Sequence, residues 1–270
     1  MSTESRNPRS IGLDKMSAQE IIRLMNEEEQ TVLRALAAAE ESIAIAAEHA
    51  AKAFQDGGRI IYVGAGTSGR VATMDAAEMP PTFGIEPDRF IAIAAGGQQA
   101  ATTANEGAED DEHAPVEILN GLHLTKRDVV IGIAASGRTP FVIAAVKHAG
   151  QKGVWTCGIA NNSHCPLFDH VDLPIFLKTG AEVLTGSTRL KAGTSQKLVL
   201  NRISTAAMVL SGKVIENLMV DVKANNDKLR DRCARIVREL TNITDDEAKS
   251  LLAENNWSVR KVVDQIRESS

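Results

Sequence analysis

The feature that most constrains the fold is the stretch from Arg59 to Arg70, which reads RIIYVGAGTSGR. Its first half is an apolar run of β-branched and aromatic residues bounded by glycines, which is typical of a strand buried on both faces. Its second half combines glycines, which let the backbone turn tightly and point N–H groups inward, with two hydroxyl side chains. Such a loop at the start of a helix forms an anion cradle. We therefore predict that Gly66, Thr67 and Ser68 bind a phosphate.

The same letters, GAGTSG, also match the fingerprint of a dinucleotide-binding loop. That site needs an Asp or Glu about 20 residues further on, at the tip of the second strand, to hold the ribose. The next expected strand, 90–94, is followed by Ala95, Gly96 and Gly97 instead. No Lys follows the last glycine, as a P-loop would require. The pattern disfavours a nicotinamide cofactor, and we expect no cofactor.

Four further apolar runs follow the first strand, and helical stretches separate most of them. Strands and helices that alternate at this spacing predict an α/β fold, a doubly wound parallel sheet flanked by helices. The expected strands are 60–63, 90–94, 129–133, 154–159 and 171–177, and the expected helices among them are 71–78, 98–105, 115–122 and 139–149. We predict one main domain over residues 59–240.

The segment after the third expected strand repeats the chemistry of the first loop. It reads AASGRTP over residues 134–140 and contains Ser136, Gly137 and Thr139. Open α/β sheets bind ligands at the carboxyl ends of their strands, so the two loops are predicted to bind one small anion together. Two ordinary N-capping turns are the alternative interpretation.

The first 58 residues are predicted to be an arm followed by helices. Residues 1–14 are polar and contain an Asn-Pro pair, so we expect an extended arm that lies on a partner. Ser17 and Glu20 form a capping box before a short helix. The alanine-rich run 28–55 is expected to be one long helix.

Two segments follow the sheet. Residues 182–195 are rich in hydroxyls, and Ser187 and Lys191 are candidate substrate ligands there. A long apolar helix over 197–220 is expected next, and core packing or a subunit interface explains it best. Residues 241–270 are predicted to be a small helical module, because a capping box opens it and apolar residues recur at helical spacing.

Two groups of carboxylates are candidates for acid–base chemistry. Glu78 lies among apolar residues before a Pro-Pro pair, so we expect a helix end there and a raised pKa, which suits a proton donor. The acidic run EGAEDDE begins at residue 106, and its Glu106 and Glu109 share a face at i, i+3. A solvated acidic helix face is the alternative for that run. One protonated and one ionised acid beside an anion cradle suit elimination or isomerisation of a sugar phosphate.

Composition excludes several other classes of function. The net charge is −5 and the pI about 5.7, which disfavours a nucleic-acid-binding surface. Three cysteines without a CxxC pair and six histidines without HxH or HExxH spacing predict neither disulfides nor a metal site. No stretch has 18 uninterrupted apolar residues and the first residues are polar, so we expect a cytoplasmic protein that does not enter the membrane.

Six blocks of the sequence resemble a known family. They are RNP at 6–8, GAGTSGR at 64–70, DAAEMPPTFG at 75–84, EGAEDD at 106–111, ASGRTP at 135–140 and EVLTGSTRLKAGT at 182–194. Together they closely resemble the N-acetylmuramic acid 6-phosphate etherases, which are members of the sugar isomerase (SIS) domain superfamily. The resemblance covers nearly the whole chain, and residues 241–270 are similar to the family's UBA-like module.

The resemblance implies an SIS-type three-layer sandwich and a carbon–oxygen lyase. Its members cleave the D-lactyl ether of N-acetylmuramic acid 6-phosphate with water in peptidoglycan recycling, as cofactor-free cytoplasmic homodimers. The family's proton donor corresponds to Glu78 and its second catalytic acid to Glu109. The hydroxyl loops would hold the phosphate.

Two other functions suit the same scaffold. A sugar-phosphate-sensing regulator, similar to the glucokinase regulatory proteins, would bind without turnover; the short chain and the two carboxylates disfavour it. An aldose–ketose isomerase would leave the DAAEMPP block unexplained.

Overall fold

The computed structural model describes residues 3–101 and 106–268, with side chains for all of these except Gln98, Ala101 and Glu106. The larger of two compact units comprises Met1–Ala76 and Asp88–Ala207 and contains a five-stranded sheet. The strands are β1 (Ile60–Gly64), β2 (Phe90–Ala94), β3 (Val129–Ile133), β4 (Trp155–Ala160) and β5 (Leu173–Phe176). Neighbouring strands are parallel, in the order β2-β1-β3-β4-β5. The predicted doubly wound parallel sheet is confirmed.

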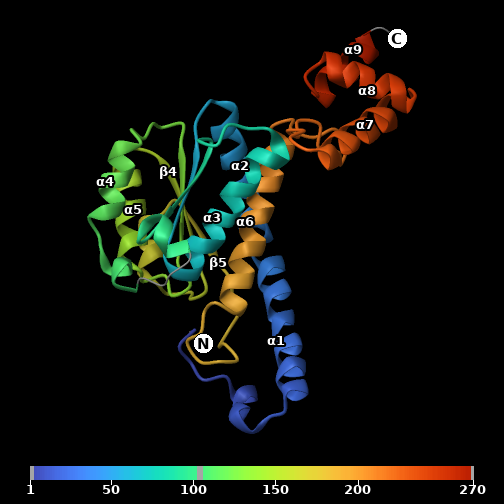
Figure 1. Ribbon diagram of the computed structural model, residues 1–270. Helices are drawn as coiled ribbons and strands as arrows, with labels where there is room; N and C mark the ends of the chain where they lie inside the picture. Colours follow the sequence, from blue (N-terminus) through green and yellow to red (C-terminus); the bar gives the residue numbers. More distant parts are fainter. Residues whose placement is uncertain (1–2, 102–105, 269–270) are drawn as a thin grey trace. The chain divides into compact units, whose positions relative to one another are not determined.

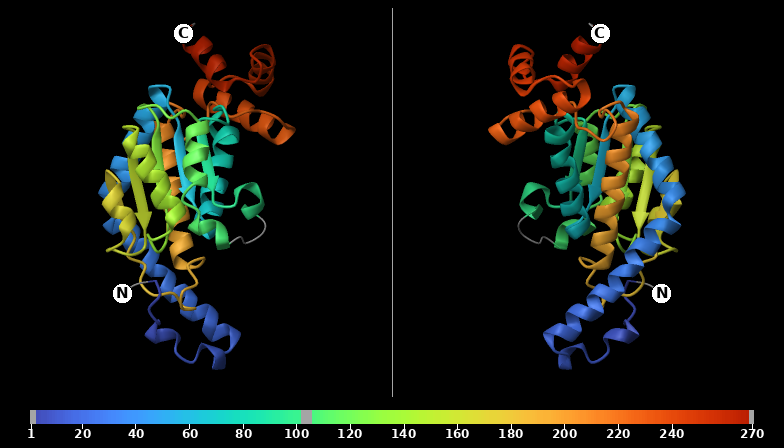
Figure 2. Two further views of the ribbon diagram at one scale, coloured as in Figure 1. Left: turned by 90° about the vertical axis from the view of Figure 1, so that its left-hand side faces the viewer. Right: turned by 90° about the vertical axis from the view of Figure 1, so that its right-hand side faces the viewer.

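Helices cover both faces of the sheet (Figures 1 and 2). One layer contains α4 (Ala114–Gly121) and α5 (Pro140–Gln151), and the other contains α2 (Glu40–Gln55), α3 (Gly66–Phe83) and α6 (Lys191–Leu210). Alternate residues of a strand point to opposite faces. In β1, Ile61 shares a core cluster with Val142 of α5, whereas the hydroxyl of Tyr62 donates to Asp75 of α3 at 3.0 Å. Both layers therefore pack against an apolar strand, which explains the unbroken apolar runs.

The N-terminal region differs from the prediction in two ways. The expected single helix over 28–55 is wrong, because α1 (Ala18–Ala38) ends at Ala39 and α2 starts at Glu40. Each helix buries its own apolar face, and this packing outweighs the helix propensity of the alanine run. The capping box of Ser17 and Glu20 is present.

The predicted extended conformation of the first residues is wrong, whereas their contact with a partner stays a prediction. They form two short 3-10 helices, η1 (Pro8–Ser10) and η2 (Leu13–Lys15), and hydrogen-bond to their own chain. Buried polar side chains, Thr3 and Asn7, provide those bonds, and the sequence pattern did not reveal their partners.

Helix α3 is longer than predicted at both ends. It begins at Gly66 and continues to Phe83, so the expected end at Glu78 is wrong. Pro80 and Pro81 lie in its last turn, where they remove only two helical hydrogen bonds. The buried side chains of Met79 and Phe83 hold that turn in place.

The segments around α4 and α6 also depart from expectation. The predicted helix 98–105 is a 3-10 helix, η3 (Gly97–Ala101), as far as the description reaches, and residues 102–105 lie outside it. The acidic run forms η4 (Glu106–Asp110), and η5 (Pro166–His170) precedes β5. The long apolar helix starts at Lys191 and ends at Leu210, ten residues before the predicted end at 220.

The smaller unit comprises Ala77–Pro87 and Met208–Ser270. Its helices are α7 (Asp227–Thr241), α8 (Asp245–Glu254) and α9 (Val259–Glu268), and α8 begins with the predicted capping box. The three helices share one apolar core, in which Cys233, Val237, Leu252 and Val262 are buried. Because α7 contributes to this core, the helical module contains residues before 241.

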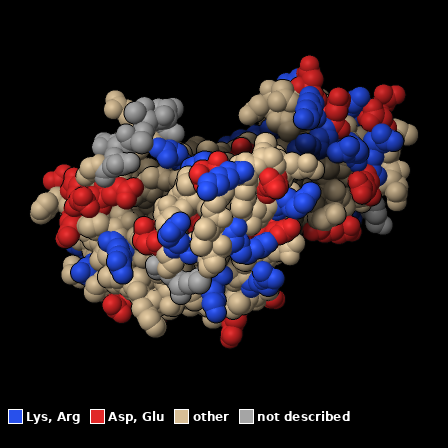
Figure 3. Space-filling view, turned by 90° about the horizontal axis from the view of Figure 1, so that it is seen from below, with Lys and Arg blue, Asp and Glu red and all other residues tan. Residues whose placement is uncertain are grey.

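Charged residues are mixed over the face shown in Figure 3, where basic and acidic side chains are interspersed. Within the described ranges no helix is both long and apolar enough to cross a membrane.

Candidate functional site

Three loops leave the sheet at its carboxyl edge, where the strands end, and two of them follow the adjacent strands β1 and β3. In the parallel register, Gly64 of β1 pairs with both Ala94 of β2 and Ile133 of β3. The chain passes from β1 to β2 on one side and continues to β3 on the other, so the strand order reverses at β1. Doubly wound sheets bind ligands at such a reversal. The first loop (residues 64–70) and the second loop (residues 134–140) are therefore neighbours, as predicted.

The first loop brings a carboxylate close to the phosphate-binding candidates. Gly66 has a φ of +52°, and a β-carbon built on it would lie 3.0 Å from Oε1 of Glu109. Glu109 therefore reaches from η4 to the start of α3. A side chain at residue 66 would push this carboxylate away, because the space between them is narrow. The left-handed backbone conformation also favours glycine at this position.

The hydroxyls of the first loop face the start of α6. Ser68 is buried, and its Oγ donates to Oε1 of Gln196 at 2.8 Å. Thr67 is half-buried, and its Cγ2 lies 3.0 Å from a β-carbon built on Gly193. Helix α6 thus closes this side of the loop.

Sequence reasoning missed the amides that support this arrangement. Gln196 Nε2 donates to Oδ1 of Asn161 at 3.2 Å, and Asn161 Nδ2 in turn donates to Thr179 and Ser195. Asn161 directly follows β4 at the carboxyl edge of the sheet, and Gln196 is a buried polar residue in an apolar helix. In the sequence, these two residues could have been found as an asparagine directly after an apolar strand and a glutamine within an apolar helix.

The second loop also depends on a glycine. Gly137 has a φ of +66°, and a β-carbon on it would overlap Sγ of Cys165. Ser136 Oγ accepts the N–H of Arg138 at 3.1 Å, and Thr139 precedes α5 without capping it through its side chain. The interpretation as N-capping turns therefore fails for Thr139, whose hydroxyl is half-buried at the loop, and for Ser68, which bonds to Gln196.

The acidic run begins with the 3-10 helix η4, and its Asp110, Asp111 and Glu112 are exposed, so the alternative of a solvated acidic face holds for these three residues. Asp111 Oδ1 accepts the N–H groups of His113 and Ala114 at 2.9 and 3.0 Å, and these backbone bonds lower the pKa of its carboxyl. Asp110 is exposed, whereas Glu109 is half-buried beside the first loop. The side chain of Glu106 lies outside the described residues.

Glu78 does not have the apolar surroundings expected from its neighbours in sequence. The buried positions of α3 include Asp75, Ala76 and Met79, which face inward at helical spacing. Glu78 lies on the opposite face with Met74 and is exposed. The helical period, rather than adjacency along the chain, determines which neighbours surround a side chain.

The third loop (residues 177–190) leads from β5 to α6 and contains Ser187. This residue is half-buried in a turn, where its N–H donates to the carbonyl of Leu184 at 3.0 Å. Glu182 is fully buried in the same loop and accepts the N–H groups of Lys191 and Ala192 at 3.1 and 2.9 Å. It holds the first turn of α6, and burial raises the pKa of its carboxyl.

Lys191 has a buried partner, Glu28. Its side chain is 4% exposed, and Nζ lies 2.6 Å from Oε2 of Glu28 in α1. Burial acts to raise the pKa of Glu28, but hydrogen bonds from Lys191 and Asn7 outweigh it and hold the pKa below its ordinary value. The ammonium is thus engaged within the protein, next to the site.

Comparisons with known proteins show the family and the fold of this chain. Residues 42–149 match the model of the glucokinase regulatory protein N-terminal SIS domain, and residues 113–203 match the SIS domain. The chain is 51% identical to the N-acetylmuramic acid 6-phosphate etherase of Halalkalibacterium halodurans over 263 residues. The aligned region covers 97% of this chain and 88% of that protein. The chain belongs to the N-acetylmuramic acid 6-phosphate etherase family. The resemblance seen in the sequence blocks is thereby confirmed, and it places the chain among enzymes.

Solved structures show that this chain has the SIS fold. A phosphoheptose isomerase from Francisella tularensis has a TM-score of 0.56 at 18% identity and covers 71% of this chain and 98% of its own. The Vibrio vulnificus NanR protein, complexed with ManNAc-6P, has a TM-score of 0.52 at 17% identity and covers 76% of this chain and 68% of its own. At these identities the likeness concerns the fold alone.

Proposed function

We propose that this protein cleaves the D-lactyl ether of N-acetylmuramic acid 6-phosphate with water, giving N-acetylglucosamine 6-phosphate and D-lactate for peptidoglycan recycling. The observation that carries the proposal is the approach of the Glu109 carboxylate to Gly66 of the first loop. A general base beside an anion-binding loop is the pair of features that this reaction needs. The 51% identity to an etherase supports the same conclusion.

The 6-phosphate is assigned to neutral donors in the first and second loops. Thr67, Ser136 and Thr139 lie in loops that leave adjacent strands, and Gly66 and Gly137 shape the backbone around them. The hydroxyl of Ser68 donates to Gln196, so Ser68 supports the first loop rather than donating its hydroxyl proton to the phosphate. Binding the phosphate there would orient the sugar carbons against the carboxylates, so that binding energy far from the reacting bond assists the reaction. Ser187 in the third loop and Glu106 in η4 are assigned to the sugar. The ammonium of Lys191 already pairs with Glu28, so we assign Lys191 to positioning the start of α6 rather than to direct contact with the sugar phosphate.

The chemistry divides between two acids. In the open-chain sugar, the C1 aldehyde acidifies the C2 proton, and Glu109 removes it. The electron pair forms the C2=C3 double bond while the C3–O bond breaks, and Glu78 protonates the departing lactate oxygen. Water then adds its hydroxide to C3, and a proton returns to C2. No redox step occurs.

We further propose a cytoplasmic homodimer. Ile22, Leu33 and Met74 are large apolar side chains that are 59%, 61% and 45% exposed in the single chain. Exposed apolar side chains of this size on two helices are typical of an interface. A second copy over the outer face of α3 would also desolvate Glu78, which a proton donor requires.

The experiment is D-lactate release from N-acetylmuramic acid 6-phosphate, run alongside exchange of the C2 proton in deuterated water. Glu109→Gln is expected to lose both exchange and release, because the base acts first. Glu78→Gln is expected to keep exchange but lose release. Asp110→Asn is the matched control, because Asp110 is the exposed acid next to Glu109 and should retain both activities. Exchange that survives in Glu109→Gln would refute the assignment of the base.

A second candidate function is regulation without turnover. The match of residues 42–149 to the N-terminal SIS domain of glucokinase regulatory protein favours it. That function predicts sugar-phosphate binding by the wild type with neither exchange nor release, so the same assay decides between the two.

A further inference from the structure

The N-terminal arm (residues 3–10) contacts the second loop through an asparagine. The backbone N–H of Thr3 donates to Oδ1 of Asn162 at 3.0 Å, and Asn162 Nδ2 donates back to Oγ1 of Thr3 at 3.2 Å. The same Nδ2 donates to the carbonyl of Ser136 at 3.2 Å. Thr3 is 1% exposed and Asn162 is half-buried, so water has little access to the contact. Asn162 therefore couples the arm to a loop assigned to the phosphate.

The arm contacts the third loop through a second asparagine. Asn7 Nδ2 donates to the carbonyl of Ala181 at 3.3 Å and to Oε2 of Glu28 at 2.8 Å. Its Oδ1 accepts the N–H of Arg9 and caps η1. Nearby, a β-carbon built on Gly186 would lie 3.2 Å from Oε2 of Glu4. All polar atoms of the Asn7 side chain are used, and Asn7 bonds both α1 and the third loop.

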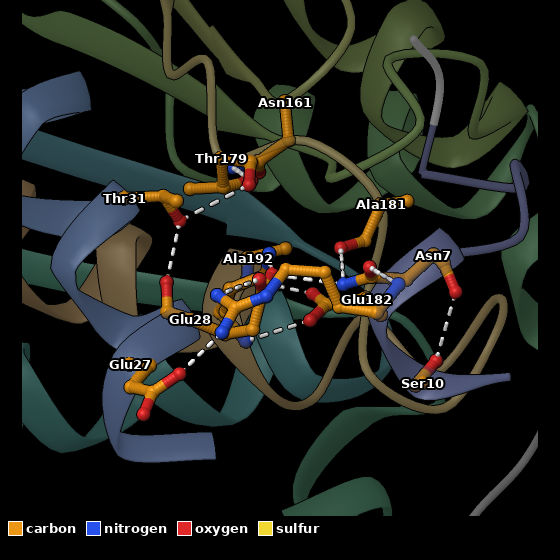
Figure 4. A network of polar contacts seen from close by, with 12 residues as sticks. Asn7, Ser10, Glu27, Glu28, Thr31, Asn161, Thr179, Ala181, Glu182 and Ala192 are labelled. Atoms are coloured by element: carbon orange, nitrogen blue, oxygen red, sulfur yellow. Dashed lines mark hydrogen bonds and ion pairs between the residues drawn. The ribbon is translucent and has the colours of Figure 1, made fainter. Parts of the chain in front are cut away.

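Glu28 connects these contacts to the start of α6 (Figure 4). It is 6% exposed and accepts from Asn7, Arg9 and Lys191. Lys191 is the first residue of α6, whose first turn Glu182 holds and whose Gln196 bonds to Ser68 of the first loop. A buried carboxylate with three donors holds them in one geometry, since separating any of them leaves a buried charge with fewer partners.

We propose that the N-terminal arm is part of the sugar-phosphate site and that Asn7 and Asn162 are positioning residues. Asn162 fixes the second loop through Ser136, and Asn7 fixes the third loop through Ala181. The ligand class is the phosphorylated amino sugar of the proposed function, on which this inference rests. Neither asparagine is assigned a contact with the ligand.

The test measures affinity for the product, N-acetylglucosamine 6-phosphate, by calorimetry on the full-length protein. Asn7→Ala and Asn162→Ala are each expected to raise Kd about tenfold, the equivalent of one well-formed hydrogen bond. Amide hydrogen exchange on the unliganded protein is expected to accelerate over 134–140 in Asn162→Ala and over 180–190 in Asn7→Ala. Asn7→Asp keeps the cap on η1 but loses the amide donor, so it should weaken binding at least as much as Asn7→Ala.

Ser17→Ala is the control for general destabilisation. It removes an exposed helix cap, which costs about 1 kcal/mol of stability, without touching any of the three loops. Its Kd and its loop exchange should match the wild type. Asparagine variants with wild-type Kd would overturn the inference while leaving the proposed function intact. A wild type that binds no product would instead refute the proposed function.

Discussion

Two ion pairs, each with a buried carboxylate, lie at opposite ends of the strands. They support different parts of the molecule. Asp128 and Arg59 pair at 2.8 Å directly before β3 and β1, at the amino ends of the strands. Glu28 and Lys191 pair at 2.6 Å where α1 meets the start of α6, beside the loops of the candidate site.

The first pair joins elements that the sheet already holds together. Asp128 accepts from the backbone N–H and the guanidinium of Arg59, and from the N–H of Thr125. Arg59 is 21% exposed and also donates to the carbonyl of Leu122. The pair therefore reinforces the start of two adjacent strands, and water can reach the cation.

The second pair joins α1 to the start of α6, in a region where Thr31 and Asn7 also bond to the third loop. Lys191 is 4% exposed, and its partner also binds the N-terminal arm. We therefore expect a buried ion pair to affect binding when it joins two helices that support the loops of a site. The pair at the amino ends should affect stability alone, and the pair beside the site should affect both stability and binding.

The largest expected effect is that of Glu28→Ala. It leaves the Lys191 ammonium buried without its carboxylate, which typically costs about 3–5 kcal/mol. Product affinity should also fall, because the arm and the start of α6 lose their common partner. Urea unfolding and calorimetry measure the two quantities. Glu27→Ala, at the preceding residue of α1, is the control. It removes only an exposed partner of Arg9 and should change stability by about 0.5 kcal/mol or less.

Asp128→Ala should have a smaller effect that is confined to stability. Arg59 keeps its bond to Leu122 and reaches water, so we expect a loss of about 2 kcal/mol in urea unfolding. Product Kd should remain that of the wild type. Asp88→Ala is the control, because Asp88 is an exposed acid whose charge also acts on Arg59. A changed product Kd in Asp128→Ala would contradict the expectation that this ion pair affects stability alone.

The smallest expected effect is a difference in acid sensitivity. Hydrogen bonds outweigh burial and hold the pKa of Glu28 below 4.5 and that of Asp128 below 3.8, their ordinary values. The unfolded chain therefore binds more protons, and each carboxylate stabilises the fold above its ordinary pKa and loses that contribution as pH falls through its folded pKa. The melting temperatures of Glu28→Gln and wild type should converge as pH falls below about 4.5, and those of Asp128→Asn and wild type only below about 3.8. Differences that stay constant with pH would contradict the assigned pKa directions.

Most of the sheet could be predicted from the sequence, and so could the adjacency of the first and second loops. The strands β1, β2 and β3 match their expected positions to within one residue, because a buried parallel strand needs an unbroken apolar run. The glycines at 66 and 137 marked both loops, since local backbone conformation requires them. These are local properties, which a linear sequence records directly.

The sequence by itself thus determined the α/β class, the two loops and the family. Only the tertiary structure decided what the polar side chains do. Glu78 faces outward, Lys191 bonds to Glu28, and Asn7 bonds to the third loop, 174 residues away in the chain. The physical reason is that apolar burial follows a short period along one element, whereas a hydrogen bond or an ion pair needs two specific atoms from elements that only the folded chain brings together.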